Sequence, residues 1–362
     1  MERYIRHLQL QDFGREAQDK LQKARVLIIG AGGLGCPVLM HLAAMGVGQL
    51  GIADGDVVAL SNLHRQLLYT EKDIGRSKAA VACEKLLQMN SSLSVEIFPV
   101  FINGKNIFPI LENFDLIVDG TDQMFTRFLI NDACLVTGKP WVYGAVYQYE
   151  GQVSVFNVWQ DGEYSVNFRD LYPDPTDAAG AVSCGEAGVL GIVPNFIGLL
   201  LANEVIKWIT GREDLLKNRL LHYHLQNHRQ NIFNIMKNNA NVFIPDRATV
   251  ENADYPALCN MRKAESSLDW KKIIEQDDTL VVDVRSANEE PFLGNYRHVK
   301  IPLSLLEEEN QVLQPYRSLV FVCQSGVRSK KALELAKNIW PEKAVYHVES
   351  GIFELLKTIR HG

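Results

Sequence analysis

A glycine-rich turn directly after a short apolar run is the feature that most constrains the fold of this chain. Residues 25–29 form an apolar, β-branched run that indicates a buried parallel strand. The turn at residues 30–35 (GAGGLG) contains the pattern G-x-G-x-x-G, and Pro37 then favours the start of a helix. Such glycines let backbone amides approach a phosphate, and the helix N-terminus adds partial positive charge. The sequence therefore predicts a nucleotide-binding turn between a strand and a helix.

Further strand and helix patterns alternate after this turn. Strands are predicted at residues 48–54, 95–100 and 114–119, and helices at 38–45 and 77–89. Repeated βα units favour a doubly wound sheet. Aromatic and β-branched residues alternate over 141–159, which indicates antiparallel strands. The predicted fold class is α/β: a Rossmann-like doubly wound sheet with an antiparallel extension, followed by a small α/β domain.

Length and composition indicate two globular domains. A chain of 362 residues is longer than the chains that usually fold around a single hydrophobic core. The predicted domains are residues 1–238 and 267–362, joined by a linker at 239–266 that lacks a clear hydrophobic period. The net charge of -6 argues against a nucleic-acid partner.

Neither membrane insertion nor secretion is expected. The apolar stretch at 188–201 is interrupted by Pro194 and closed by Glu204, so it indicates a buried helix rather than a membrane span. The polar start of the chain lacks the apolar region of a secretory signal. Six cysteines are present and none forms a C-x-x-C pair. These features favour a reduced, cytoplasmic protein.

Charged side chains follow the ends of the predicted strands. Asp54 ends the second strand, where a carboxylate can accept hydrogen bonds from ribose hydroxyls. Arg65 and Lys78 would stabilise a triphosphate and the leaving pyrophosphate, which a nicotinamide cofactor does not require. Asp122 follows the strand predicted at 114–119 and suits magnesium bound between phosphate oxygens. The set favours ATP with magnesium over NAD, although the glycine turn alone fits both.

Several motifs in one order give the chain a specific resemblance. They are RYIRH at residues 3–7, GAGGLG at 30–35, DGD at 54–56, SNLHRQ at 61–66, Lys78, TD at 121–122, YEGQ at 149–152 and VSC at 182–184. In this order they resemble the MoeB/ThiF/HesA family, the bacterial relatives of ubiquitin-activating enzymes, from about residue 2 to 235. The resemblance implies attack of a Gly-Gly carboxylate on the α-phosphate of ATP, with release of pyrophosphate.

The resemblance also assigns roles to residues of this chain. Asp54 would hold the ribose, Asp122 would bind magnesium, and Arg6 would reach the ATP of a partner subunit in a homodimer. The implied nucleotide contacts are Gly30, Gly32, Gly33, Gly35, Asp54, Asn62, Arg65, Gln66, Lys78 and Asp122.

One cysteine and one missing motif concern the loop before the apolar stretch. By resemblance, Cys184 stands where family members carry a cysteine that captures the activated carrier or joins sulfur transfer; a buried, inert thiol is the alternative. Many relatives also bind structural zinc with two C-x-x-C pairs. This chain has NFRD at 167–170 in the first place, and Cys259 stands alone in the second. Since such zinc needs four ligands, no structural zinc is expected.

The second domain carries a different cysteine loop. Cys323 follows a predicted buried strand, and the segment from Cys323 to Ser329, which includes Arg328, precedes the helix predicted at 330–338. Loop amides and a nearby cation favour the thiolate. With DVR at 283–285 and ESGI at 349–352, the region from about 267 to 362 resembles a rhodanese domain, in which Cys323 would carry a persulfide. A cysteine phosphatase domain is the alternative to a rhodanese domain. Phosphatase loops have five residues between the cysteine and the arginine, whereas four residues lie between Cys323 and Arg328 here.

Together the two halves predict a nucleotidyltransferase, a sulfur-carrier-protein adenylyltransferase, with rhodanese-type sulfurtransferase activity. The expected partners are a small ubiquitin-like sulfur-carrier protein ending in Gly-Gly, a sulfur donor such as a cysteine desulfurase, and a second copy of the chain. The thiocarboxylate product would serve molybdopterin biosynthesis, or alternatively thiamin thiazole. An inactive carrier-binding scaffold and an NAD-linked oxidoreductase remain more remote alternatives.

Overall fold

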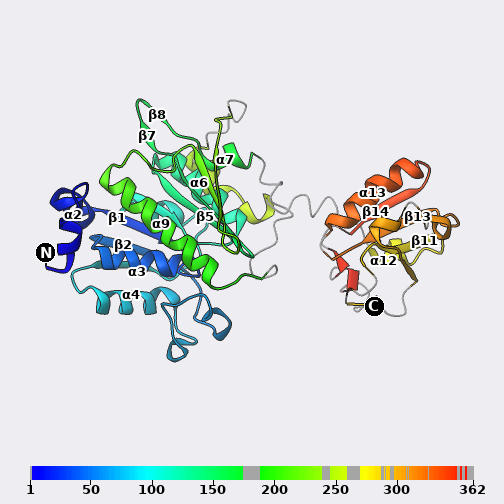
Figure 1. The fold of residues 1–362 in the computed structure, drawn as a ribbon, viewed down its shortest axis with the longest axis horizontal. Coiled ribbons are helices and arrows are strands. Elements are labelled where there is room, and N and C mark those ends of the chain that lie inside the picture. Colours follow the sequence, from blue (N-terminus) through cyan, green and yellow to red (C-terminus); the bar gives the residue numbers. More distant parts are fainter. Residues whose placement is uncertain are drawn as a thin grey trace. The chain divides into compact units, whose positions relative to one another are not determined.

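Two compact units make up the chain, residues Met1–Met261 and Arg262–Gly362 (Figure 1). A computed structural model describes residues 2–173, 188–238, 245–258, 270–286, 289, 291–293, 297–306, 308, 310–324, 326–348, 351–352 and 355–356. Each unit is an α/β structure with its own sheet, as the sequence predicts.

The first unit is built on an eight-stranded sheet with the order β10-β9-β6-β5-β4-β1-β2-β3. Strands β3, β2, β1, β4 and β5 run parallel, whereas β6, β9 and β10 continue the sheet antiparallel. The strands are β1 (Arg25–Ile29), β2 (Gln49–Ala53), β3 (Ser94–Phe98), β4 (Leu116–Asp119), β5 (Trp141–Tyr147), β6 (Glu150–Phe156), β9 (Arg219–His224) and β10 (Arg229–Asn234), with a separate hairpin of β7 (Trp159–Gln160) and β8 (Glu163–Tyr164). This is the doubly wound sheet with an antiparallel extension that the sequence predicts.

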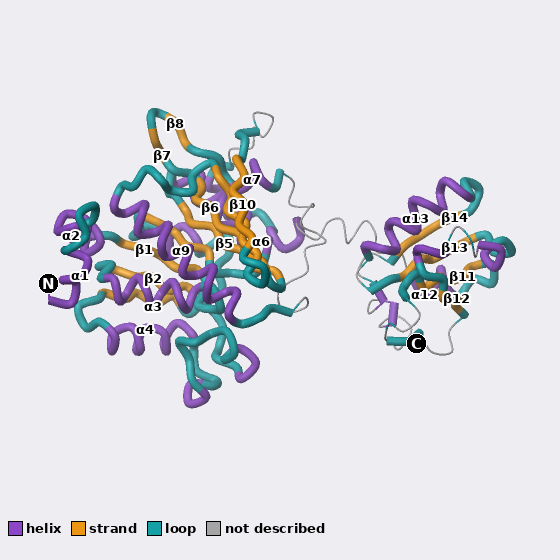
Figure 2. Tube along the Cα trace, viewed as in Figure 1, coloured by secondary structure: helices purple, strands orange, loops and turns teal. Residues whose placement is uncertain are grey.

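Helices cover both faces of this sheet (Figure 2). They are α1 (Ile5–Leu8), α2 (Gly14–Lys23), α3 (Gly35–Met45), α4 (Lys78–Met89), α5 (Ile107–Leu111), α6 (Met124–Thr137), α7 (Phe168–Leu171), α9 (Ile192–Thr210) and α10 (Arg247–Asn252). Alternate residues of β1 point to opposite faces. Val26 and Ile28 join a core with α3, α4 and α9, while Leu27 and Ile29 join one with α5, α6 and α7. Burial on both faces explains the unbroken apolar run.

Helix α3 begins two residues earlier than the sequence predicts, at Gly35 rather than Pro37. The first turn closes because the Cys36 amide donates to the Gly32 carbonyl at 2.9 Å. The glycine turn therefore already forms the start of the helix. The helix predicted at 77–89 agrees with α4 within one residue. Ser77 caps this helix by accepting a hydrogen bond from the Ala80 amide.

The apolar stretch after residue 188 forms most of α9. By length and composition α9 is a candidate membrane span among the described helices. Its Val193, Ile197, Leu201 and Val205 are nonetheless buried in the core of the first unit. The predicted buried helix is confirmed.

A buried ion pair joins α6, α7 and residues 245–258. Arg169 donates to both carboxylate oxygens of Asp132, at 2.8 and 2.6 Å, and the Tyr255 hydroxyl donates to the same carboxylate at 2.8 Å. All three residues are buried. Residues 245–258 thus pack on the first unit, although the sequence places them in the linker at 239–266.

Replacing Arg169 with alanine is expected to lower the free energy of unfolding by about 3 kcal/mol, because Asp132 would keep a buried charge without its main partner. Urea unfolding of the full chain measures this. Arg15, whose pair with Asp19 is exposed, provides the matched control, and its replacement with alanine should cost less than about 1 kcal/mol. Equal losses for the two variants would contradict the expected role of the buried pair.

The second unit contains a four-stranded parallel sheet with the order β12-β11-β13-β14. Its elements are α12 (Trp270–Ile274), β11 (Thr279–Asp283), β12 (His298–Lys300), β13 (Ser318–Val322), α13 (Val327–Ile339) and β14 (Ala344–His347). Alternate residues of β11 again enter two cores, Leu280 and Val282 in one and Val281 in the other. Residues 353–358, whose pattern also predicts a helix, lie largely outside the described residues.

Candidate functional site

Loops at the carboxyl ends of β1, β2 and β4 surround a cavity of about 500 Å³ in the first unit. In parallel α/β sheets this edge is where ligands bind. The structure brings to its wall nine of the residues predicted from the sequence: Gly30, Gly32, Gly33, Asp54, Asn62, Arg65, Gln66, Lys78 and Asp122.

Three glycines of the turn have two different roles. Gly30 has a φ of +92°, and a Cβ on it would lie 2.8 Å from the backbone of Gly120. Gly35 lies outside the cavity wall, and a Cβ on it would overlap the Gly30 carbonyl. These two glycines close the turn against its neighbours. A Cβ on Gly32 would meet only the Gln66 side chain at 3.5 Å, so this part of the backbone is open to a phosphate.

Carboxylates fix the turn and the predicted lysine. Asp54 accepts hydrogen bonds from the amides of Ala31 and Asp56, at 2.7 and 2.8 Å. The buried Lys78 donates from Nζ to Asp56 at 2.7 Å. Asp56 belongs to the DGD motif, but its place in that motif did not indicate a role for it. In the fold it sets the position of the lysine ammonium.

Arg65 and Gln66 supply a cation and a buried acceptor. Arg65 donates to the Ser61 carbonyl at 3.0 Å, and its own carbonyl accepts from Asn195 at 3.0 Å. Gln66 is buried, and its Oε1 has no hydrogen-bond partner within the described part of the chain. Because an unpaired buried acceptor is costly, this oxygen suits a donor on a bound molecule.

The loop that carries Asp122 is held by a buried carboxylate at the end of β4. Asp119 accepts from the amide and hydroxyl of Thr121, at 2.8 and 2.7 Å, and from Arg127 Nε at 3.3 Å. Burial raises the pKa of Asp119, whereas Arg127 and Thr121 favour its charged form. Asp122 itself is exposed on the cavity wall. Arg127 follows Asp122 closely in the sequence, but only the structure shows that it braces this loop.

Arg6 lies apart from the cavity of its own chain. Arg6 is exposed on α1, donates to Gln9 at 3.3 Å, and does not line the cavity of its own chain. Cys184 lies outside the described residues. Among the described cysteines, Cys36 is buried beside the cavity, and burial raises its pKa to about 12, which makes it a poor nucleophile.

The second unit brings Cys323 to the start of α13, as the sequence predicts. Cys323 is fully buried, and its Sγ accepts a hydrogen bond from the Ser329 amide at 3.3 Å. The Ser329 hydroxyl lies 3.5 Å from the same sulfur. Gly326, with a φ of +85°, makes the sharp turn between the strand and the helix. This arrangement places amide and hydroxyl groups around one sulfur atom.

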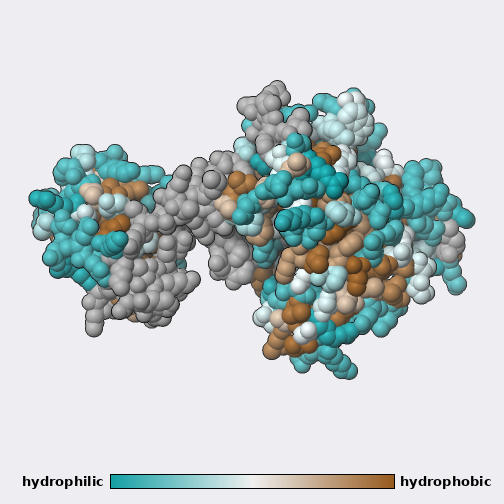
Figure 3. Space-filling model, turned by 180° about the vertical axis from the view of Figure 1, so that it is seen from behind, coloured by the Kyte–Doolittle hydropathy of each residue, from teal (hydrophilic) through white to brown (hydrophobic). Residues whose placement is uncertain are grey.

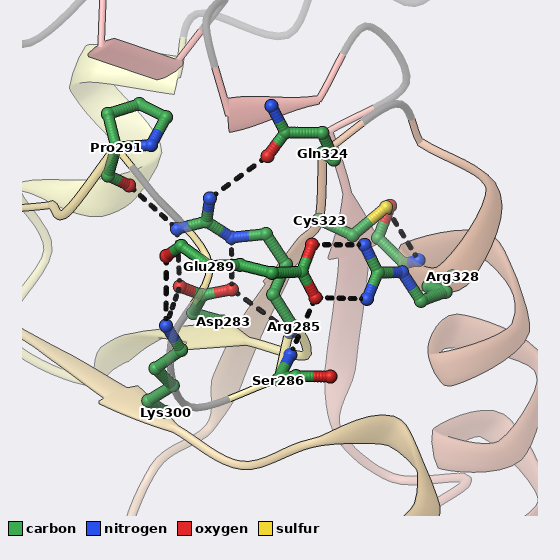
Figure 4. A network of polar contacts seen from close by, with 10 residues as sticks. Asp283, Arg285, Ser286, Glu289, Pro291, Lys300, Cys323, Gln324 and Arg328 are labelled. Atoms are coloured by element: carbon green, nitrogen blue, oxygen red, sulfur yellow. Dashed lines mark hydrogen bonds and ion pairs between the residues drawn. The ribbon is translucent and has the colours of Figure 1, made fainter.

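Two arginines of this unit form ion pairs near the cysteine loop (Figure 4). The buried Arg285 binds both oxygens of Asp283, at 2.9 and 2.8 Å, and donates to the Gln324 side chain at 3.1 Å. Arg328 donates to both carboxylate oxygens of Glu289, at 2.6 and 2.7 Å. This pairing with Arg328 lowers the pKa of Glu289 to about 2. The sequence revealed Arg285 and Arg328 through their motifs, but no pattern singled out Glu289.

Comparisons with known proteins find relatives over nearly the whole chain. The model of the ThiF family matches residues 4–243. A protein of Mycobacterium tuberculosis named "Probable adenylyltransferase/sulfurtransferase MoeZ" is 37% identical over 99% of this chain and 93% of its own length. The "Sulfur carrier protein adenylyltransferase" of Thermus thermophilus is 41% identical over 72% of this chain and 97% of its own.

A solved structure resembles the fold of the chain. The crystal structure of E. coli MccB with succinimide is similar with a TM-score of 0.55 at 25% identity, covering 66% of this chain and 72% of that one. Together with the family model and the full-length relative, this match confirms the resemblance inferred from the sequence. The chain belongs to the ThiF family.

Proposed function

We propose that this chain uses ATP to adenylate the C-terminal glycine of a small ubiquitin-like sulfur-carrier protein and that Cys323 supplies sulfur toward its thiocarboxylate, for molybdopterin biosynthesis. The observation that carries the first half is the single cavity that joins an open glycine turn to Asp54, Arg65, Lys78 and Asp122. The names of relatives over nearly the full chain and over the first unit support both halves.

In adenylation the protein mainly positions the two reactants and stabilises the negative charge of the transition state. A carrier carboxylate oxygen attacks the α-phosphorus of ATP, the bond to the β-phosphate breaks, and pyrophosphate leaves. Arg65 and Lys78 line the cavity with positive charge for that leaving group. Asp122 would hold a magnesium ion, which supplies charge neutralisation at the phosphate oxygens. An exposed carboxylate on the cavity wall has the oxygen donors that this ion prefers.

Sulfur transfer uses the Cys323 thiolate as nucleophile. The thiolate attacks the outer sulfur of a donor persulfide, the donor sulfur–sulfur bond breaks, and the donor leaves as a thiolate. The persulfide on Cys323 then attacks the carrier carbonyl, and AMP leaves. A further thiol attacks the Cys323 sulfur, which releases the carrier thiocarboxylate and leaves a disulfide. The hydrogen bond from the Ser329 amide to Cys323 Sγ suits an anionic sulfur.

ATP–pyrophosphate exchange with purified protein, magnesium and each candidate Gly-Gly carrier tests this function. Exchange that depends on one carrier is expected. The identity of that carrier distinguishes molybdopterin biosynthesis from thiamin thiazole biosynthesis. A folded protein that gives no exchange with any carrier would favour the inactive scaffold instead.

We also propose a homodimer. Four large apolar side chains beside the cavity are exposed: Leu60, Leu67, Leu190 and Ile192. Their segments adjoin, since Gly191 lies against the backbone of His64. Figure 3 shows apolar side chains gathered on one face of the first unit. Such patches mark association surfaces in soluble proteins.

A mixing experiment tests whether Arg6 acts on the partner's nucleotide. Arg6→Ala and Asp122→Ala should each lack exchange activity alone. In a mixed dimer, the Arg6→Ala chain keeps Asp122 and its partner provides Arg6, so one complete site forms. Equal mixing after reversible dissociation should restore up to about a quarter of wild-type exchange in a two-fold symmetric dimer. No recovery, although mixed dimers form, would place Arg6 in the site of its own chain or outside the mechanism.

A further inference from the structure

An ion pair at the rim of the cysteine loop has no role in the mechanism described so far. The Glu289 carboxylate binds the Arg328 guanidinium through two hydrogen bonds of 2.6 and 2.7 Å. We propose that Glu289 is a positioning residue that holds Arg328 beside Cys323 and so keeps the cysteine sulfur in its reactive anionic form. The proposal rests on the sulfur-transfer function of Cys323 and adds a residue to it.

Glu289 is itself fixed from several directions. Its Oε1 accepts from the Ser286 amide at 2.8 Å, and its own amide donates to the Ser286 carbonyl at 3.1 Å. Lys300 donates to the Glu289 carbonyl at 3.2 Å. The carboxylate therefore stands on a turn that is bonded through both side chain and backbone (Figure 4). A carboxylate fixed in this way can orient a flexible partner.

Arg328 needs such a partner more than Arg285 does. The Arg285 side chain is completely buried, whereas 37% of the Arg328 side chain is exposed. A long, partly exposed side chain samples many rotamers unless a paired group selects one. Arg328 directly precedes Ser329, whose amide contacts the Cys323 sulfur. The positive charge of the Arg328 guanidinium interacts with the same sulfur. Holding the guanidinium in place therefore strengthens its electrostatic effect on the thiolate.

The other charges near the loop include a second ion pair, which is buried. In the described part of the second unit, the charged and titratable groups on the elements around Cys323 are Asp283 and Arg285 at the end of β11, Glu289 after them, His298 and Lys300 on β12, Arg328 and the exposed Lys330, Lys331, Glu334 and Lys337 on α13, and Tyr346 and His347 on β14. Asp283 neutralises Arg285 within a buried pair, and Lys300 lies 4.0 Å from the same carboxylate. In the pair of Arg328 and Glu289, a single substitution of the glutamate frees the arginine side chain from its fixed position.

The test is the pH dependence of Cys323 alkylation in the full chain, measured with iodoacetamide and peptide-resolved mass spectrometry. In Glu289→Ala the pH of half-maximal rate should rise by about one unit, because the cation is no longer held near the thiolate. Arg328→Ala should give a similar rise. The double variant should add little to either, since both changes remove the same guanidinium effect. Glu308→Ala, which removes an exposed carboxylate of the same unit, should leave the profile unchanged.

An unchanged profile in Glu289→Ala would overturn the proposal. A fall of the midpoint would also overturn it, because the carboxylate would then act only by repelling the thiolate. If Glu289→Ala does not fold, Glu289→Gln retains the size and one acceptor oxygen, and a smaller rise is expected for it. Alkylation needs neither carrier nor sulfur donor. A chain that shows these shifts without transferring sulfur would refute the proposed function and leave the positioning role intact.

Discussion

Replacing Asp122 with alanine is expected to slow ATP–pyrophosphate exchange by about 10²–10³-fold, the usual effect of losing one electrostatic stabiliser of a transition state. Asp122 is the exposed carboxylate on the cavity wall next to the loop that Asp119 fixes. Without it, a magnesium ion that shields the phosphate oxygens would lose the protein ligand proposed for it. Exchange measured with the cognate carrier at saturating ATP reports this loss directly.

The exposed position of Asp122 makes this variant informative. Its side chain is not part of the buried network at Asp119, so urea unfolding should give the wild-type midpoint. Asp19→Ala removes an exposed carboxylate on α2 and serves as the matched control, with wild-type exchange expected. Unchanged exchange in Asp122→Ala would remove Asp122 from the mechanism and require another magnesium ligand.

Replacing Cys323 with serine should reduce formation of the carrier thiocarboxylate by about 10³-fold or more, because a hydroxyl cannot carry a persulfide. Exchange of pyrophosphate should stay at the wild-type rate, since the cavity proposed to bind ATP is lined by residues of the first unit. Intact mass spectrometry of the carrier, after incubation with ATP and a persulfide donor, measures the product.

Cys83 gives a matched control for this experiment. It is a half-buried thiol on α4, and burial raises its pKa. Cys83→Ser should therefore leave both activities unchanged. Full thiocarboxylate formation by Cys323→Ser would mean that sulfur reaches the carrier by a route that bypasses the second unit. Loss of both activities in Cys323→Ser would mean that the two reactions are coupled more tightly than the proposed function requires.

Local patterns explain why much of the nucleotide site was predictable. The apolar run of β1 ends at Gly30, and this order of residue types specifies a strand followed by a tight turn. Asp54 and Asp122 each come just after a parallel strand. The carboxyl ends of parallel strands lie at one edge of a sheet, so these residues had to meet there. Gly35 shows the limit of this reasoning, since its place in the motif did not reveal that it packs under the turn rather than lining the cavity.

Partners that meet only in three dimensions could not be found in this way. Glu289 is 39 residues from Arg328, and Asp132 is 123 residues from Tyr255. Nothing in the neighbouring sequence distinguishes these acidic residues from solvated ones. Each becomes identifiable because the fold places a guanidinium or a hydroxyl within hydrogen-bonding distance of the carboxylate.

The sequence by itself determined the α/β class, the doubly wound sheet with its antiparallel extension, and the side chains that converge at its edge. Periodicity, glycine turns and motif order are short-range properties, and the chain carries them whatever its partners are. The tertiary structure decided that Asp56 holds Lys78, that Asp119 braces the loop of Asp122, and that Glu289 binds Arg328. Charge pairing depends on distance through space, and only the packed sheets and helices bring these groups within reach of one another.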